Sequence, residues 1–274
     1  MRKPLLKAVA TVVTAVAMAV VAPTAAFAKP PGPEPKPVVS STLGNDISWP
    51  QCGKALPSGQ AFGIVGVTGG LANDSNPCFG AQLSWAQGSS GATGQPRTAL
   101  YINTANPGVL AEWWPSANTT RQGSPVANPY GTCTHGDDEA CAYVYGYAMA
   151  QDDATLRGVV TPSSYLWWLD VETENTWSPT DLAANAAALE GMTAYLEGIG
   201  ARVGLYSTNF QWSVIVGPVS ATSNLNGLPS WLAGASSEKD ARSRCLSGTP
   251  LTPGGTVAVV QYIAKNLDYN VSCF

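Results

Sequence analysis

The sequence feature that most constrains the fold is a strand, a helix and a second strand in succession between residues 165 and 206. The apolar runs at 166–171 and 203–206 each predict a buried strand. Residues 179–199 between them predict a helix, with Ser178 as its cap, a proline in its first turn and glycines at its end. A helical crossover joins parallel strands, so this unit predicts an α/β fold.

Similar apolar runs occur along the rest of the chain. Six of them extend the pattern, although 142–148 can also be interpreted as part of one helix spanning 137–157. The expected strands are 46–49, 62–67, 99–103, 142–148, 166–171, 203–206, 230–232 and 257–262. Eight strands alternating with helices predict a single (β/α) barrel of the TIM type, with some irregularity allowed. The polar stretch 106–132 is expected to be an insertion over one face.

The N-terminal part of the chain has the composition of an export signal. Residues 1–28 combine three cations, an apolar run and a small-x-small site at 26–28, so we expect a cleaved signal peptide. Residues 29–42 are rich in proline and predict an extended linker, and 43–274 then form the folded domain. The expected location is outside the cell, secreted or associated with the cell wall.

Charge and cysteine content agree with that location. The chain has 14 basic and 18 acidic residues, and loss of Arg2, Lys3 and Lys7 with the signal leaves 11 against 18, about −7. Nucleic acid and membrane surfaces are therefore not expected as partners. Six cysteines without metal-ligand spacing predict disulfides in an exported protein. Proximity in sequence favours the pairs Cys52–Cys78, Cys133–Cys141 and Cys245–Cys273.

The candidate catalytic residues are carboxylates at strand ends. Asp170 and Glu172 are two residues apart, so they face the same side where their strand ends, and barrel sites lie at that end. Two carboxylates that share a pocket repel each other, which raises one pKa and allows that group to act as a general acid. Asp46 near the end of the first strand and Asp268 from the last strand could reach the same place. The alternative is that these acids only cap a helix or bind a loop amide.

Aromatic and amide side chains near the same strand ends would form a cleft suited to sugar rings. The candidate substrate-binding residues are Trp49, Gln51, Tyr101, Tyr206, Trp231, Gln261 and Tyr262. No metal or cofactor is expected, because the single histidine, His135, lies in a polar loop and cannot supply a zinc triad or a Ser-His-Asp site. The glycines at 66–70 are not followed by the lysine or helix of a phosphate loop.

Several of these segments, in this order, resemble the glycoside hydrolase family 25 lysozymes. The similar segments are 46–51 (DISWPQ), 169–172 (LDVE), 205–207 (LYS), 231–234 (WLAG) and 260–262 (VQY), followed by Asp268. The chain looks closer still to actinobacterial glycoside-hydrolase-like domain proteins of unknown function. The resemblance covers about residues 43–270 and implies a modified (β/α) barrel. It also implies Glu172 as the proton donor with Asp170 beside it, and Asp46 and Asp268 along the sugar cleft.

The chain departs from the family in its second and third strands. Family members carry a KATEG type of segment and a GxYHF type of strand, whereas this chain has VTGG at 67–70 and ALYIN at 99–103. Despite these differences, we expect a secreted, monomeric glycoside hydrolase that acts on the β-1,4 links of peptidoglycan, with cell-wall glycan as its partner. The alternative is a weak or inactive barrel that binds the same glycan.

Overall fold

The structure is a computed structural model that describes residues 41–274. Eight strands form a closed barrel in chain order. The strands are β1 (Leu43–Ile47), β2 (Gly63–Gly66), β3 (Thr98–Asn103), β4 (Leu166–Asp170), β5 (Arg202–Ser207), β6 (Ser230–Ala235), β7 (Val257–Ala264) and β8 (Leu267–Ser272). Neighbouring strands from β1 to β7 are parallel, and β8 runs antiparallel to both β7 and β1. The predicted α/β barrel is confirmed, and its irregularity is this last strand.

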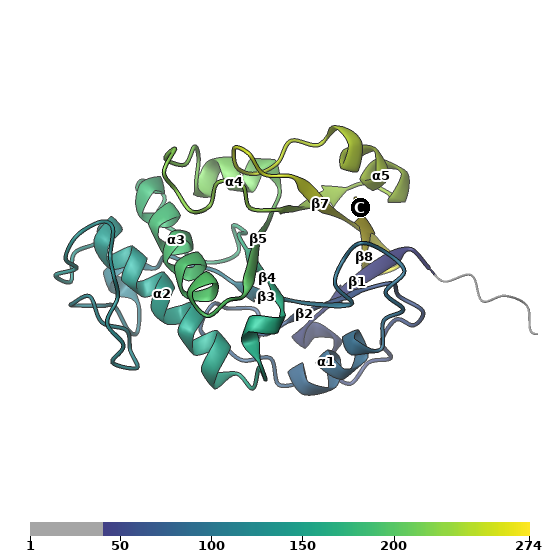
Figure 1. The fold of residues 1–274 in the computed structure, drawn as a ribbon, viewed down its shortest axis with the longest axis horizontal. Coiled ribbons are helices and arrows are strands. Elements are labelled where there is room, and N and C mark those ends of the chain that lie inside the picture. The colour runs from purple at the N-terminus through teal and green to yellow at the C-terminus, as the bar shows by residue number, and fades with distance from the viewer. Residues whose placement is uncertain (1–40) are drawn as a thin grey trace, which may run out of the picture. The chain divides into compact units, whose positions relative to one another are not determined.

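Helices cover the outside of the barrel after most strands (Figure 1). They are α1 (Phe79–Gln87), α2 (Glu139–Leu156), α3 (Leu182–Gly198), α4 (Asn209–Ile215) and α5 (Glu238–Ser247). A single 3₁₀ turn (Trp49–Gln51) follows β1 instead of a longer helix. Asp181 caps α3 by accepting a hydrogen bond from the Ala184 amide, so the helix starts three residues later than predicted, and Ser178 is not its cap.

The predicted strand at 142–148 is wrong, because these residues lie inside α2. The alternative interpretation of 137–157 as one helix is the correct one. Asp138 caps this helix through the Cys141 amide. The helix is buried on most sides, so its apolar residues do not show the one-sided spacing that identifies a surface helix.

The last strand, β8 (Leu267–Ser272), was not predicted from the sequence. β7 and β8 form a hairpin whose two turn residues, Lys265 and Asn266, both have a positive φ, as a two-residue hairpin turn requires. Asp268 and Asn270 lie in β8, so its sequence is too polar to be recognised as a buried strand.

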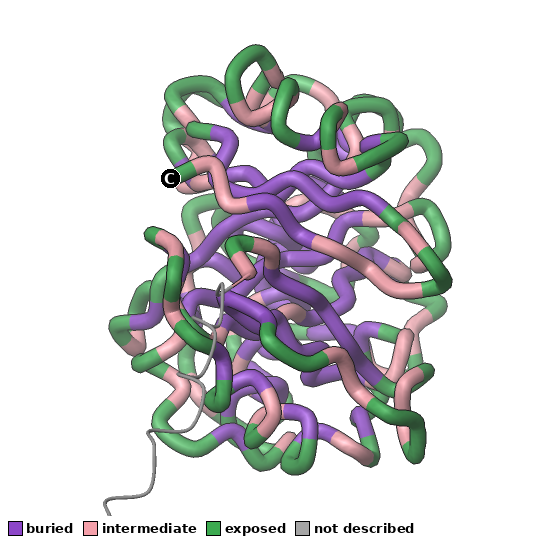
Figure 2. The backbone as a smooth tube through the Cα atoms, turned by 90° about the vertical axis from the view of Figure 1, so that its right-hand side faces the viewer, coloured by how far each residue is buried: buried purple, intermediate pink, exposed green. Residues whose placement is uncertain are grey.

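The core has two layers, and the buried residues of Figure 2 lie largely along the strands. Alternate strand residues point outward under the helices or inward into the barrel. Trp167 and Leu169 belong to the outer layer, whereas Trp168 and Trp231 fill the interior. Outside, α2 and α3 cross so closely that a Cβ on Gly146 would lie 1.8 Å from the Ala188 carbonyl oxygen. Only glycine permits this contact.

The insertion after β3 packs against the outer side of α2 (Figure 1). Trp114 and Val126 are its buried anchors, and the Cys133–Cys141 disulfide joins its end to the first turn of α2. The other two disulfides also pair as predicted, Cys52 with Cys78 and Cys245 with Cys273. Cys273 follows β8, so the last bond ties the closing strand to α5.

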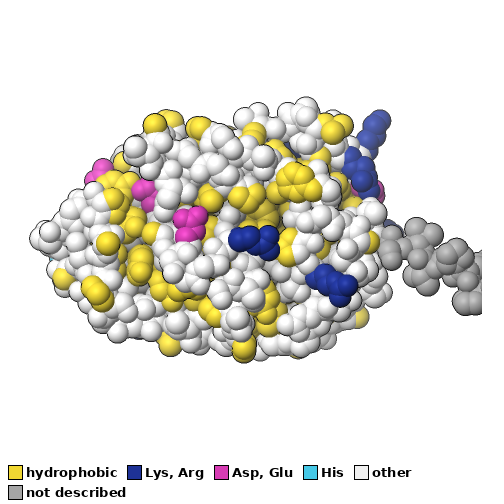
Figure 3. All heavy atoms as spheres, viewed as in Figure 1, with side chains coloured by type: hydrophobic (Ala, Val, Ile, Leu, Met, Phe, Trp, Pro, Cys, Tyr) yellow, Lys and Arg dark blue, Asp and Glu magenta, His cyan; other side chains and the backbone are white. Residues whose placement is uncertain are grey.

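The surface carries few charges. Most of the face in Figure 3 consists of uncharged polar, backbone and apolar atoms, with isolated acidic and basic side chains. Within residues 41–274, no helix is both long enough and apolar enough to cross a membrane. The predicted signal peptide and most of the predicted linker lie outside the described residues.

Candidate active site

A cavity of about 240 Å³ opens at the carboxyl ends of the parallel strands. Strand alternation and register explain why its side chains meet. Asn103, Asp170, Tyr206 and Trp231 are successive partners across β3, β4, β5 and β6, so their side chains form one row inside the barrel. The lining residues are Asp46, Tyr101, Asp170, Glu172, Tyr206, Trp231, Gln261, Ile263 and Asp268.

Eight of the eleven site residues predicted from the sequence line this cavity. All four predicted carboxyl groups are among them. The other three lie elsewhere: Trp49 is 48% exposed beside Gly70, the Gln51 side chain accepts a hydrogen bond from the Ser48 amide, and Tyr262 stacks on Tyr269. Tyr262 points away from the barrel interior because it follows Gln261, which points inward.

Asp46 sits at the centre of a buried hydrogen-bond network. Its Oδ1 accepts from Gln261 Nε2 at 3.0 Å and from Asn270 Nδ2 at 2.6 Å. Tyr206 donates to Gln261 Oε1 and Trp231 donates to Asn270 Oδ1, so the network joins β1 to β5, β6, β7 and β8. Burial, helped by the charge of Asp268, raises the pKa of Asp46 to about 7.

Asp170 is the most deeply buried carboxyl group of the cavity, with 4% of its surface exposed. Asn103 Nδ2 donates to its Oδ2 at 2.7 Å, and Thr68 holds Asn103 by donating to its Oδ1 at 2.8 Å. Burial first, and then the neighbouring Glu172 carboxyl, raise the pKa of Asp170 well above its usual range. Asp170 is therefore the group of this pair that keeps a proton most strongly.

Glu172 is less buried and reaches solvent. Burial and the charge of Glu174 raise its pKa, while hydrogen bonding with Asp170 and Tyr206 opposes that rise. Its backbone is fixed, because its carbonyl oxygen accepts from Trp177 Nε1 at 2.8 Å. Burial also raises the pKa of Asp268. The cavity thus holds four carboxyl groups with raised pKa values, which suits proton donation near neutral pH.

Three aromatic rings form the apolar wall of the cavity. The Tyr206 and Trp231 rings have centroids 4.3 Å apart, and Tyr101 meets Trp231 edge to face at 6.3 Å. Gly66 provides the room for Tyr101, because a Cβ there would lie 2.7 Å from the Tyr101 Cζ atom. A polar floor beside an aromatic wall is typical of sites that bind sugars.

The sequence interpretation missed two residues that shape the site. Asn103 donates a hydrogen bond to Asp170. Its position as a polar residue at the end of an apolar strand could have indicated a role in the site. Asn270 holds Asp46, but it lies in the strand that was not predicted. Among the described residues, no three His, Cys, Asp or Glu side chains are placed to hold a metal ion.

The fold is similar to those of solved muramidase and lysozyme structures. The muramidase from Trichobolus zukalii is 18% identical, with a TM-score of 0.49, over 85% of this chain and 93% of its own. The lysozyme from Streptomyces coelicolor is 17% identical, with the same TM-score and the same coverage.

Comparison with curated proteins gives local sequence matches, whereas no model of a protein family matches the chain. A probable GH family 25 lysozyme 4 of Dictyostelium discoideum is 38% identical over 66 residues, which are 24% of this chain and 29% of that protein. Lysozyme-like protein 5 of Caenorhabditis elegans is 39% identical over 77 residues, 28% of this chain and 34% of that protein. The chain spans about a third of the length of these relatives. The resemblance inferred from its motifs is confirmed, and over about a quarter of its length the chain is similar in sequence to a probable lysozyme of glycoside hydrolase family 25 and to a lysozyme-like protein.

Proposed function

We propose that the chain is a glycoside hydrolase that cleaves the β-1,4 links of peptidoglycan by carboxyl acid catalysis. The observation that carries this proposal is the cavity at the barrel mouth, where Asp46, Asp170, Glu172 and Asp268 meet three aromatic rings. Glycosidases use paired carboxyl groups around a transition state that resembles an oxocarbenium ion. The local similarity to lysozymes supports peptidoglycan as the substrate.

Glu172 is the proposed proton donor to the glycosidic oxygen. It is more exposed than Asp170, so a sugar can reach it, and its raised pKa keeps it protonated at a higher pH than a solvated glutamate. Asp170 lies two residues before it on the same face and, held by Asn103, fixes the position of the Glu172 carboxyl group through the hydrogen bond between the two carboxyl groups. The acetamido group of the substrate could then assist beside Asp170.

Asp46 and Asp268 are proposed to stabilise positive charge on the sugar. They are direct partners across β1 and β8, so they line one side of the cavity together. Burial raises the pKa of each group and so disfavours its charge in the empty cavity. A positive charge developing on the sugar would favour the ionised forms, and the low polarity of a closed site would strengthen that attraction. The aromatic wall of Tyr101, Tyr206 and Trp231 would contact the sugar rings.

We also propose that the protein acts outside the cell. Three disulfides suit an oxidising compartment, and no free cysteine occurs among the described residues. The export signal proposed for residues 1–28 would deliver the chain there.

The test is release of reducing ends from purified actinobacterial peptidoglycan by the wild type and by Glu172→Gln. Loss of a general acid is expected to lower kcat by about 10²- to 10⁴-fold. Glu197→Gln near the end of α3 is a matched control, because Glu197 lies at the opposite end of the barrel and its change should leave turnover intact. Unchanged turnover in Glu172→Gln would contradict the assignment of the proton donor. No release by the wild type, with retained binding to the wall, would favour the binding barrel.

A further inference from the structure

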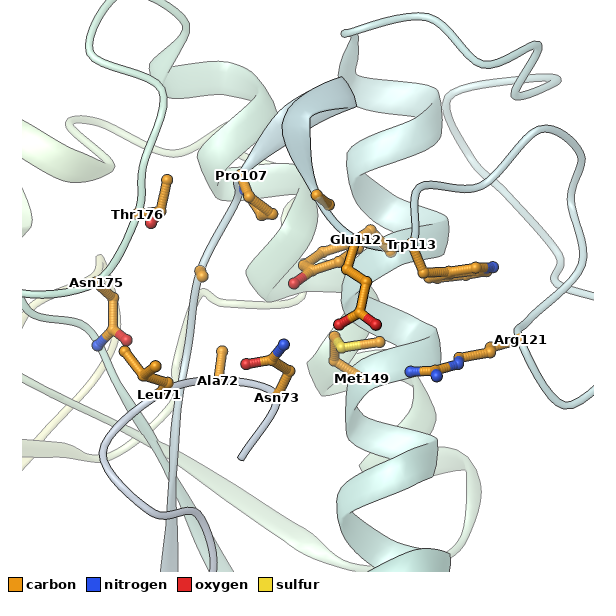
Figure 4. A pocket seen from close by; sticks show the side chains of 13 residues that line it. Leu71, Ala72, Asn73, Pro107, Glu112, Trp113, Arg121, Met149, Asn175 and Thr176 are labelled. Carbon is orange, nitrogen blue, oxygen red and sulfur yellow. The ribbon is translucent and has the colours of Figure 1, made fainter. Parts of the chain in front are cut away.

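Figure 4 shows a second cavity, which is lined by segments that follow the carboxyl ends of barrel strands. Its walls come from the segments that follow the carboxyl ends of β2, β3 and β4, and from the side of α2 that faces them. Tyr145 and Met149 of α2 form its back, and the insertion supplies Trp113, whose ring stacks near Tyr145 with centroids 6.3 Å apart. Its volume is about 180 Å³, compared with about 240 Å³ for the carboxyl cavity.

Two opposite charges face this cavity. Figure 4 shows the Glu112 carboxylate and the Arg121 guanidinium extending toward the space in front of Met149. Both belong to the insertion after β3. The ion pairs among the described residues involve other side chains, so neither charge is neutralised within this part of the protein. A ligand with both an amino or amide N–H group and a carboxylate would satisfy the two charges together.

The second cavity is joined to the carboxyl cavity by short backbone contacts. Ala105 lines the second cavity, and the preceding Thr104 donates through its hydroxyl to the Asp170 carbonyl oxygen at 2.6 Å. Asn175 also lines the second cavity, and its backbone N–H donates to the Glu172 carbonyl oxygen at 3.3 Å. The segments after β3 and β4 that line the second cavity are therefore in direct contact with the backbone of Asp170 and Glu172.

From this arrangement we infer that the second cavity binds the peptide that substitutes the glycan of peptidoglycan. This inference rests on the proposed function and specifies its substrate as peptide-bearing glycan. A peptide presents amide donors to Glu112, a free carboxylate to Arg121 and aliphatic side chains to Trp113 and Met149. An unsubstituted neutral glycan offers no partner for the guanidinium charge.

The experiment compares two substrates made from one wall preparation. One is soluble glycan that carries its peptides. The other is the same glycan after an amidase has removed the peptides and the sugar carboxylates left by this hydrolysis have been converted to uncharged amides. Wild type is expected to have the lower KM for the peptide-bearing glycan. Arg121→Ala should raise that KM by about tenfold with kcat unchanged, and should leave the KM for stripped glycan as it was. Glu112→Gln is a second variant with the same expected direction. Arg202→Ala at the start of β5, which lies at the other end of the barrel, is the matched control.

A binding measurement separates this inference from the proposed function. The free peptide released by the amidase is titrated into wild type and into Arg121→Ala, with binding followed by calorimetry. Binding that is lost in the variant supports the inference even if the wild type releases no reducing ends. Equal KM values for the two glycans together with no peptide binding would overturn it while leaving hydrolysis intact. A raised KM of Arg121→Ala for stripped glycan would also overturn it, because the cavity would then be a sugar subsite.

Discussion

Replacing Asp46 with asparagine is expected to change how stability depends on pH. The Asp46 Oδ1 atom accepts both main hydrogen bonds, from Gln261 and from Asn270, whereas Oδ2 accepts only a second contact from Gln261 at 3.1 Å. Protonation of Oδ2 therefore removes only this longer contact and leaves both hydrogen bonds to Oδ1 in place. An asparagine with its carbonyl oxygen in the Oδ1 position copies this protonated state, with an amide group in place of the acid hydroxyl.

The size of the effect follows from the pKa of Asp46. That pKa is about 7 in the folded protein against an ordinary value of 3.8, so the native state binds more protons than the unfolded state between these limits. The stability that depends on the proton is complete below about pH 4 and is lost as the pH rises through about 7. A difference of about three units between the two pKa values corresponds to about 4 kcal/mol in the free energy of unfolding. Asparagine does not ionise and avoids this loss.

The assay is equilibrium unfolding in urea of the disulfide-bonded protein between about pH 4 and pH 8. The free energy of unfolding of Asp46→Asn, measured relative to wild type, should rise by about 4 kcal/mol across this range. The side-chain amide group of the asparagine faces the amide donor of Gln261, which should lower the stability of Asp46→Asn by about 1 kcal/mol at every pH. The change of the stability difference with pH is therefore the quantity that tests the prediction. Parallel curves for the two proteins would refute a buried Asp46 with a raised pKa.

Asp240→Asn on α5 is a control of opposite sign. Hydrogen bonds from the Ser236 amide and from Arg244 lower the pKa of Asp240, whose side chain is partly exposed. Its stabilising contribution is present above the ordinary pKa and is lost as the pH falls. Asp240→Asn should therefore be less stable than wild type near neutral pH, and the difference should shrink in acid.

Two further predictions concern the active site. If Glu172 is the acid, kcat should fall as the pH rises through its pKa, and Glu174→Gln should move that alkaline limb to lower pH, because the charge of Glu174 raises the pKa of Glu172; an unmoved limb in the pH profile would argue against Glu172 as the titrating group. Gly66→Ala should lower stability by about 1 to 3 kcal/mol and raise KM, because its Cβ would lie 2.6 Å from Ser48 Cβ and 2.7 Å from Tyr101 Cζ. Thermal unfolding and initial rates measure both effects, and a neutral alanine variant would show that Tyr101 does not depend on this close approach.

Strand-end carboxylates could be predicted from the sequence because the rule behind them is local. Side chains two apart share a face, and the parallel strands of a barrel open at one end, so Asp170 and Glu172 could be placed together without knowledge of packing. Aromatic residues were harder to place. Which of Gln261 and Tyr262 points inward depends on the strand register, and this register is set by pairing with β8.

Two predictions from the sequence failed for physical reasons: the strand expected at 142–148, which is part of α2, and the omission of β8. The apolar residues of α2 lie on most of its sides because the insertion, α3 and the barrel all pack on it, so it read equally well as a strand. β8 (LDYNVS) turns its polar residues Asp268 and Asn270 into the barrel, the reverse of the usual burial of apolar strand residues, and only its alternating pattern marks it as a strand. In both cases the tertiary environment outweighs the local pattern.

The antiparallel closure of the barrel makes the site depend on the two most distant parts of the folded chain. Asn270 Nδ2 and the Asp46 Oδ1 atom that it holds are 224 residues apart in sequence, and Asp268 is the direct strand partner of Asp46. Such a contact forms only after the intervening strands and helices are arranged, because closing so long a loop is entropically costly. The carboxyl cavity would thus be one of the last features to form during folding. Removal of β8 would leave a sheet with two open edges and no complete site.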